Sequence, residues 1–136
     1  MFRRKLFAFM FTVIICMPII GFCFMLIEQS TISEIPGLII FASMYAIPVT
    51  LLFGVPVSIL SDKMNDRLIG TKRVLSSFAI HLLFGISFPF FFMLLADSRS
   101  ILTNFNWGDL YFLIPSTLIS FVGWGMDEVL RIYFRN

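Results

Sequence analysis

The sequence predicts an all-α integral membrane protein, a bundle of four transmembrane helices with both termini in the cytoplasm. Of its 136 residues, 59% are hydrophobic and 13% are charged, whereas a soluble domain has about 45–50% apolar and about 25% charged residues. Four apolar blocks contain no Asp, Glu, Lys or Arg: residues 6–27, 35–60, 74–96 and 110–126. A helix that crosses a hydrocarbon core of about 30 Å needs roughly 20 such residues, so each block is a candidate span of a single transmembrane domain.

The first span is expected at residues 6–27, directly after three basic residues. A basic start followed by an apolar run also opens a signal peptide. This run, however, is longer than the apolar region of such a peptide, and no small-x-small cleavage site follows it before Glu28. We therefore expect an uncleaved span.

The second span is expected at residues 35–60 and contains the candidate helix kink, at Pro48, Gly54 and Pro56. Each proline lacks the amide hydrogen that an internal helix position donates, so we expect a kinked or locally opened helix there. Because prolines are common in membrane helices, an ordinary bend is the alternative to a functional one.

The third span is expected at residues 74–96 and the fourth at residues 107–126. The fourth apolar block is the shortest, but Trp107 and Trp124 frame a stretch of about 26 Å and would lie at the two membrane interfaces. Small residues recur at helical spacing in all four spans, which predicts close packing between helices. One such stripe could instead form a homo-oligomer interface; it consists of Ala42, Ala46, Thr50, Gly54 and Ser58.

The basic residues indicate the orientation. Nine of the ten lie at the N terminus, in the loop after the second span or beyond the fourth span, and only Arg99 lies on the other side. Loops rich in Lys and Arg stay in the cytoplasm, so we expect both termini there, in a bacterial plasma membrane. The nine residues are Arg3, Arg4, Lys5, Lys63, Arg67, Lys72, Arg73, Arg131 and Arg135.

His81 is the only histidine and the only ionisable side chain well inside an expected span. Such a group is a candidate for proton relay or ligand contact. The alternative is a neutral imidazole that hydrogen-bonds across the bundle. A proton-coupled transporter usually holds a carboxylate near the midplane, and the four apolar blocks contain none.

The sequence offers little support for enzymatic chemistry. One His and two Cys on another helix face make no metal-ligand set, and neither a Gly-x-Ser-x-Gly elbow nor a glycine-rich phosphate loop occurs. The basic residues flank the apolar blocks instead of forming one patch, which argues against nucleic-acid binding. We expect no metal, no cofactor and no catalytic residue.

Opposite charges lie together at the ends of the second and fourth spans. They could lock the helix ends together, dock a partner protein or anchor the chain on anionic lipid headgroups. The residues concerned are Asp62, Lys63, Asp66, Arg67, Asp127, Glu128 and Arg131.

A resemblance to a known family lies in two stretches of the chain. They are FGVPVSILSDKM at residues 53–64 and WGMDEVLR at residues 124–131. Together with the four-span pattern, they resemble a family of uncharacterised small four-span integral membrane proteins of Bacillus-type bacteria. The resemblance implies no catalytic residue and no substrate. It implies a recurring pattern that includes Gly54, Pro56, Ser58, Asp62, Asp127, Glu128 and Arg131.

Two functions follow as hypotheses. The preferred one is a non-enzymatic membrane protein that binds a partner, such as an accessory or immunity-type subunit, with the charged helix ends as the docking surface. The alternative is a small oligomeric transporter or channel in which His81 and the kinked second span line a path. The expected partners are the lipid bilayer and either another membrane protein or a second copy of the chain.

Overall fold

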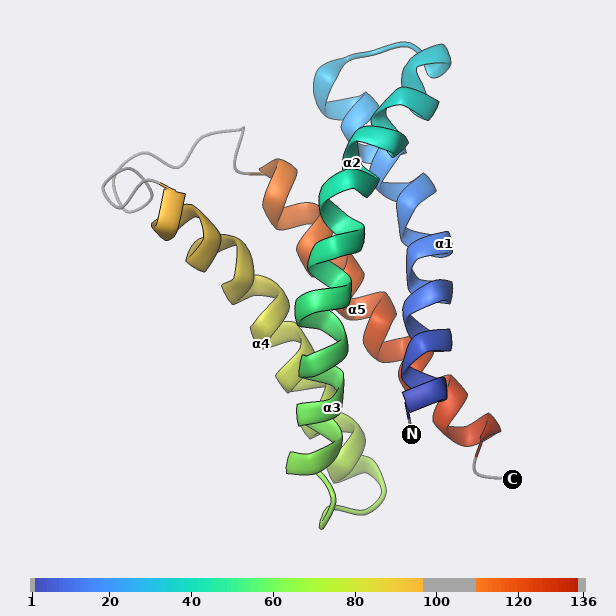
Figure 1. The fold of residues 1–136 in the computed structure, drawn as a ribbon, viewed down its shortest axis with the longest axis vertical. Coiled ribbons are helices and arrows are strands. Elements are labelled where there is room, and N and C mark those ends of the chain that lie inside the picture. The colour runs from blue at the N-terminus through green and yellow to red at the C-terminus, as the bar shows by residue number, and fades with distance from the viewer. Residues whose placement is uncertain (1, 97–109, 135–136) are drawn as a thin grey trace.

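The computed structural model describes residues 2–96 and 110–134, and these are helical apart from short turns (Figure 1). The predicted all-α class is therefore confirmed for this part of the chain. Arg99, Trp107 and Arg135, which enter the predictions of orientation and of the fourth span, lie outside the described residues. The elements are α1 (Phe2–Glu28), η1 (Ile32–Glu34), α2 (Ile35–Val49), η2 (Thr50–Gly54), α3 (Val55–Met64), α4 (Thr71–Ala96) and α5 (Leu110–Tyr133).

Within the described residues, three helical segments are long and apolar enough to cross a membrane: Arg3–Glu28, Ile32–Met64 and Thr71–Phe91. They coincide with the first three expected spans. Helix α5 covers the expected fourth span from Leu110 onward and continues past it to Tyr133.

The second expected span is one continuous helical path made of α2, η2 and α3 (Figure 1). The turn η2 is π-helical, and the amide of Val55 donates to the carbonyl of Thr50, five residues earlier. Pro48 lies inside α2 and Pro56 in the first turn of α3, on either side of this turn. Since Pro56 has no amide hydrogen to donate, the regular α-helical ladder is interrupted where the sequence predicts a locally opened helix.

Small side chains allow the helices to approach closely. In α1, Ala8, Thr12 and Cys16 are 6%, 1% and 0% exposed. Gly85 brings α4 against α5, because a Cβ atom at this position would overlap the side chain of Ser120. Many large apolar side chains face outward instead, as expected for helices that contact lipid.

The stripe of small residues in the second expected span faces the interior of the monomer. Ala42, Thr50 and Ser58 are buried, and Ala46 and Gly54 are half-buried. The stripe therefore packs within one chain and offers little surface for a second copy.

Candidate functional site

The start of α1 and the ends of α3 and α5 lie at one end of the molecule (Figure 1), and a lysine is buried among them. Lys5 is 2% exposed. Its Nζ lies 2.5 Å from the Asp127 carboxylate and 2.8 Å from that of Asp62. It also donates to the hydroxyl of Ser58 at 2.7 Å and to the carbonyl of Ser58 at 3.1 Å. An ammonium has three hydrogens to donate, so these four acceptors use all of them.

Two arginines complete what we call the charge cluster, formed by Arg4, Lys5, Asp62, Asp127 and Arg131. Arg4 pairs with Asp62, and its Nε lies 3.1 Å from the Asp127 carboxylate. Arg131 also pairs with Asp62, and burial followed by the nearby Arg4 charge lowers the pKa of its guanidinium. The two carboxylates thus connect α1, α3 and α5.

The structure places the other charged candidates at the margin of the cluster or away from it. Glu128 pairs with Arg73, which joins α5 to α4. Asp66 lies exposed after α3, and it forms no ion pair with any residue that the structure describes. Asp66 is therefore not part of the site that contains Asp62 and Asp127.

From the sequence, Asp127 could lock helix ends together, dock a partner or anchor the chain on lipid headgroups, and Arg4 and Lys5 entered only as flanking basic residues that indicate the orientation. In the structure Lys5 and Asp127 are both 2% exposed and pair with one another, so they connect helix ends as in the first of these roles. The sequence signal that could have identified Lys5 and Asp127 as buried is their position. Each lies directly beside an apolar block, on a helix that continues through that block.

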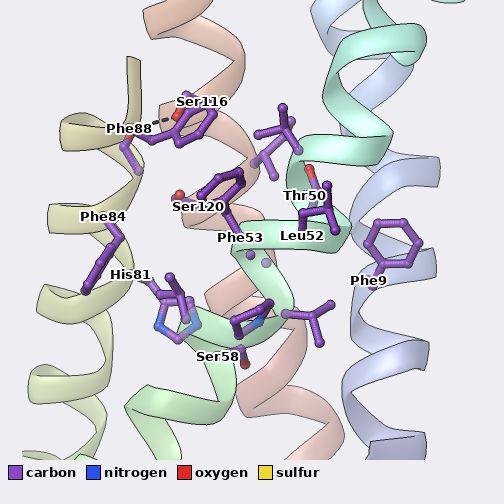
Figure 2. Close-up of a pocket in the computed structure, with 18 of the residues that line it drawn as sticks. Phe9, Thr50, Leu52, Phe53, Ser58, His81, Phe84, Phe88, Ser116 and Ser120 are labelled. Carbon is purple, nitrogen blue, oxygen red and sulfur yellow. Dashed lines mark hydrogen bonds between the residues drawn. The ribbon is translucent and has the colours of Figure 1, made fainter. Parts of the chain in front are cut away.

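A cavity of about 640 Å³ begins at Lys5 and extends between α1, the η2–α3 segment, α4 and α5 (Figure 2). Its wall is predominantly apolar. The aromatic ring of Phe53 in η2 meets that of Phe88 in α4 at a centroid distance of 4.9 Å, which brings the two helices together at one side. The polar residues of the wall are Lys5, Thr12, Thr50, Ser58, His81, Ser87, Ser116 and Ser120.

His81 extends from α4 toward the space between the helices (Figure 2). The side chain is 6% exposed, and its Nδ1 lies 2.8 Å from the carbonyl oxygen of Ser77. A carbonyl only accepts hydrogen bonds, so Nδ1 carries the hydrogen, and the neutral ring presents a lone pair at Nε2. This Nε2 is buried and has no hydrogen-bond partner among the described residues.

Three hydroxyl groups of the wall use their hydrogens on helix backbone. Thr12 and Thr50 each donate to the carbonyl four residues earlier, at 2.7 and 2.6 Å. Ser116 donates to the carbonyl of Gly85 at 2.5 Å. The oxygen lone pairs of these hydroxyls remain as acceptors.

The kink residues contribute unequally to the cavity. Gly54 and Pro56 lie on its wall together with Thr50, so the π-helical turn forms part of the lining. Pro48 is exposed and lies outside the lining. Because π-helical turns widen a helix locally, η2 shapes the wall that faces His81.

Among the described residues, no group of three or more His, Cys, Asp or Glu side chains could hold a metal ion. Comparisons with family models, with curated proteins and with solved structures find no match for the chain. The site is therefore interpreted from its own geometry.

Proposed function

We propose that this chain is a non-enzymatic multi-pass protein of a bacterial plasma membrane that binds a small molecule in the cavity between its helices, as a small transporter does. One observation carries the proposal: a cavity of about 640 Å³ has the size of a small-molecule site, for which roughly 300–1,000 Å³ is usual. Its wall is apolar with a few polar groups, one of which, His81 Nε2, is buried without a partner among the described residues.

The membrane topology in this proposal has four spans, with α5 as the fourth and both termini in the cytoplasm. The excess of basic residues on one side supports this orientation. Single cysteines at Ser33 and Asp66, both exposed, test it in a variant without the two native cysteines. A membrane-impermeant maleimide should label Ser33→Cys on intact cells and Asp66→Cys only after permeabilisation. The reverse pattern would contradict the orientation.

Docking of a partner on the charged helix ends is the weaker candidate. Asp62, Asp127 and Arg131 already pair with residues of the same chain, and a partner would have to separate these buried pairs. The charged residues left exposed around them, such as Asp66, are interspersed in sign and well solvated. A second protein that copurifies stoichiometrically from native membranes would restore this candidate.

Binding in the cavity can be measured with 1-aminoanthracene, a small apolar fluorophore that brightens in apolar surroundings. The protein in lipid nanodiscs should give a saturable signal above that of empty nanodiscs. Val57 lines the cavity and is half-buried, so Val57→Phe should fill the cavity and remove the saturable signal.

Val129→Phe is the matched control, because Val129 is 59% exposed and lies outside the cavity wall. This variant should bind the probe as the unaltered protein does. Circular dichroism and gel filtration establish that both variants are folded. Absence of saturable binding in the unaltered protein, or equal loss in both variants, would refute the proposal.

A further inference from the structure

We infer that the cavity selects uncharged molecules that combine an apolar body with a hydrogen-bond donor, and that His81 Nε2 accepts this hydrogen bond. The inference rests on the proposed function and specifies the chemical class of the ligand. Alcohols and phenols belong to this class.

The first argument is that most polar groups of the cavity wall have used their hydrogens within the chain, while His81 Nε2 is an acceptor left unpaired among the described residues; the hydroxyls of Ser87 and Ser120 can donate or accept. The hydroxyl hydrogens of Thr12, Thr50 and Ser116 are used on backbone carbonyls. The ammonium hydrogens of Lys5 are used on the charge cluster and Ser58. His81 donates through Nδ1 to its own helix and leaves a lone pair at Nε2. A ligand that donates a hydrogen bond would satisfy this buried acceptor, and one that only accepts would leave it unpaired.

The second argument concerns charge. An anionic ligand would seek Lys5, the cation on the wall, but the hydrogens of this ammonium already go to Asp62 and Asp127, at 2.8 and 2.5 Å, and to Ser58. A cationic ligand would seek these carboxylates, which Arg4 and Arg131 also bind. Burial of an unpaired charge in an apolar cavity is strongly unfavourable. The cavity should therefore exclude both kinds of ion.

The third argument concerns the body of the ligand. The rings of Phe9, Phe53, Phe84 and Phe88 line the cavity (Figure 2). Apolar and aromatic surfaces of this kind bind an apolar ligand by removing its surface from water. The polar group should be small and lie at one end, where it can reach Nε2.

The test compares three naphthalene derivatives as competitors of 1-aminoanthracene in nanodiscs at neutral pH. 1-Naphthol donates a hydrogen bond, 1-methoxynaphthalene has the same ring system without a donor, and 1-naphthylmethylamine carries a positive charge. We expect 1-naphthol to displace the probe about 3- to 10-fold more effectively than the ether, which corresponds to one net hydrogen bond. The amine should be the weakest competitor.

Two substitutions at His81 assign the preference to Nε2. His81→Leu removes the acceptor and should reduce the preference for 1-naphthol over the ether to within about 2-fold. His81→Gln retains an acceptor oxygen and should keep most of the preference for 1-naphthol over the ether. Because the ratio is compared between protein variants in the same lipid, differences in partition between the two compounds cancel from that comparison.

The outcomes separate the inference from the proposed function. Three outcomes would overturn the inference, and saturable probe binding would then still leave the cavity as a binding site. They are an unchanged preference for 1-naphthol in His81→Leu, no such preference in the unaltered protein, and the amine as the best competitor. If His81→Leu lost probe binding and His81→Gln retained it, the result would support the inference about His81 Nε2. Loss of probe binding in both variants would overturn this inference. A lack of saturable binding to the unaltered protein would refute the proposed function itself.

Discussion

The charge cluster and the cavity both bury polar side chains, but the buried lysine and aspartate of the cluster are paired within the chain, whereas the cavity leaves the Nε2 of its histidine unpaired among the described residues. Lys5 and Asp127 are each 2% exposed, and each has partners from other helices. His81, 6% exposed, is buried almost as deeply, yet its Nε2 has no partner among the described residues. A buried polar group that is fully paired holds elements together, whereas one that is left unpaired is available to a ligand.

The largest expected effect comes from breaking the charge cluster. Asp127→Ala leaves the ammonium of Lys5 buried with fewer partners, and it should lower the free energy of unfolding by about 3–5 kcal/mol. Unfolding in mixed detergent and dodecyl sulfate micelles, followed by circular dichroism, measures this change. Asp66→Ala is the control, because Asp66 is exposed and should change stability by about 0.5 kcal/mol or less.

A double substitution sharpens this prediction. Lys5→Met combined with Asp127→Leu removes both charges of the closest pair and should recover much of the lost stability, since apolar replacements of buried ion pairs are often neutral. If Asp127→Ala were no more damaging than Asp66→Ala, the cluster would not hold the helices together.

The close approach of α4 and α5 gives the next largest effect. Gly85→Ala would place a Cβ atom against Ser120 and should cost about 1–3 kcal/mol of unfolding free energy. Gly125→Ala in α5 meets open space and should be neutral or stabilising by up to about 1 kcal/mol. Adding Ser120→Gly to Gly85→Ala should relieve the overlap. Equal effects of the two alanine substitutions would contradict this packing.

The partly exposed pair at the margin of the cluster should contribute less. A double-mutant cycle of Arg73→Gln and Glu128→Gln should give a coupling free energy of about 0–1 kcal/mol. This coupling should decrease with added salt, because the side chains are 15% and 14% exposed and thus lie closer to solvent than Lys5 and Asp127. A coupling as large as the effect of Asp127→Ala would remove the distinction between the buried cluster and its margin.

The smallest effect on stability should come from His81. His81→Leu removes one nitrogen that has no partner within the described part of the chain and one that donates to the carbonyl of Ser77. The backbone of α4 still pairs that carbonyl, so the effect on the free energy of unfolding should be about 0.5 kcal/mol or less. The same unfolding assay measures it. A loss comparable to that of Asp127→Ala would show that His81 is a structural residue, as the alternative interpretation of the sequence holds.

Local sequence was a good guide wherever the chemistry is local. Pro56 lacks an amide hydrogen whatever surrounds it, so the sequence could mark the segment beside it as a candidate for an opened helix, and η2 lies there. The same chemistry leaves the α-helix assignment uninterrupted at Pro18, Pro48, Pro89 and Pro115. The long apolar blocks likewise predict helices that could cross a membrane, and three such segments are present in the described residues. His81 could be singled out because an ionisable group is rare in an apolar block.

The contents of the charge cluster could not be predicted in this way. Asp62 and Asp66 have the same side chain and are one helical turn apart, yet Asp62 binds Arg4, Lys5 and Arg131 and Asp66 is exposed. Helix α3 ends at Met64, so Asp66 lies in the turn that follows and leaves the face on which Asp62 meets α1 and α5. The sequence does not show where this helix ends, because the two aspartates have the spacing of one helical face.

The sequence by itself determined the helical class, the apolar segments, the candidate kink around Pro56 and the candidacy of His81, because each depends on composition, periodicity or covalent structure. Only the tertiary structure decided that Lys5 is buried against Asp127 and that a cavity lies between the helices. Pairing and cavities arise from the relative placement of helices that are far apart in the chain. Many short-range contacts fix that placement together, and no single stretch of sequence encodes it.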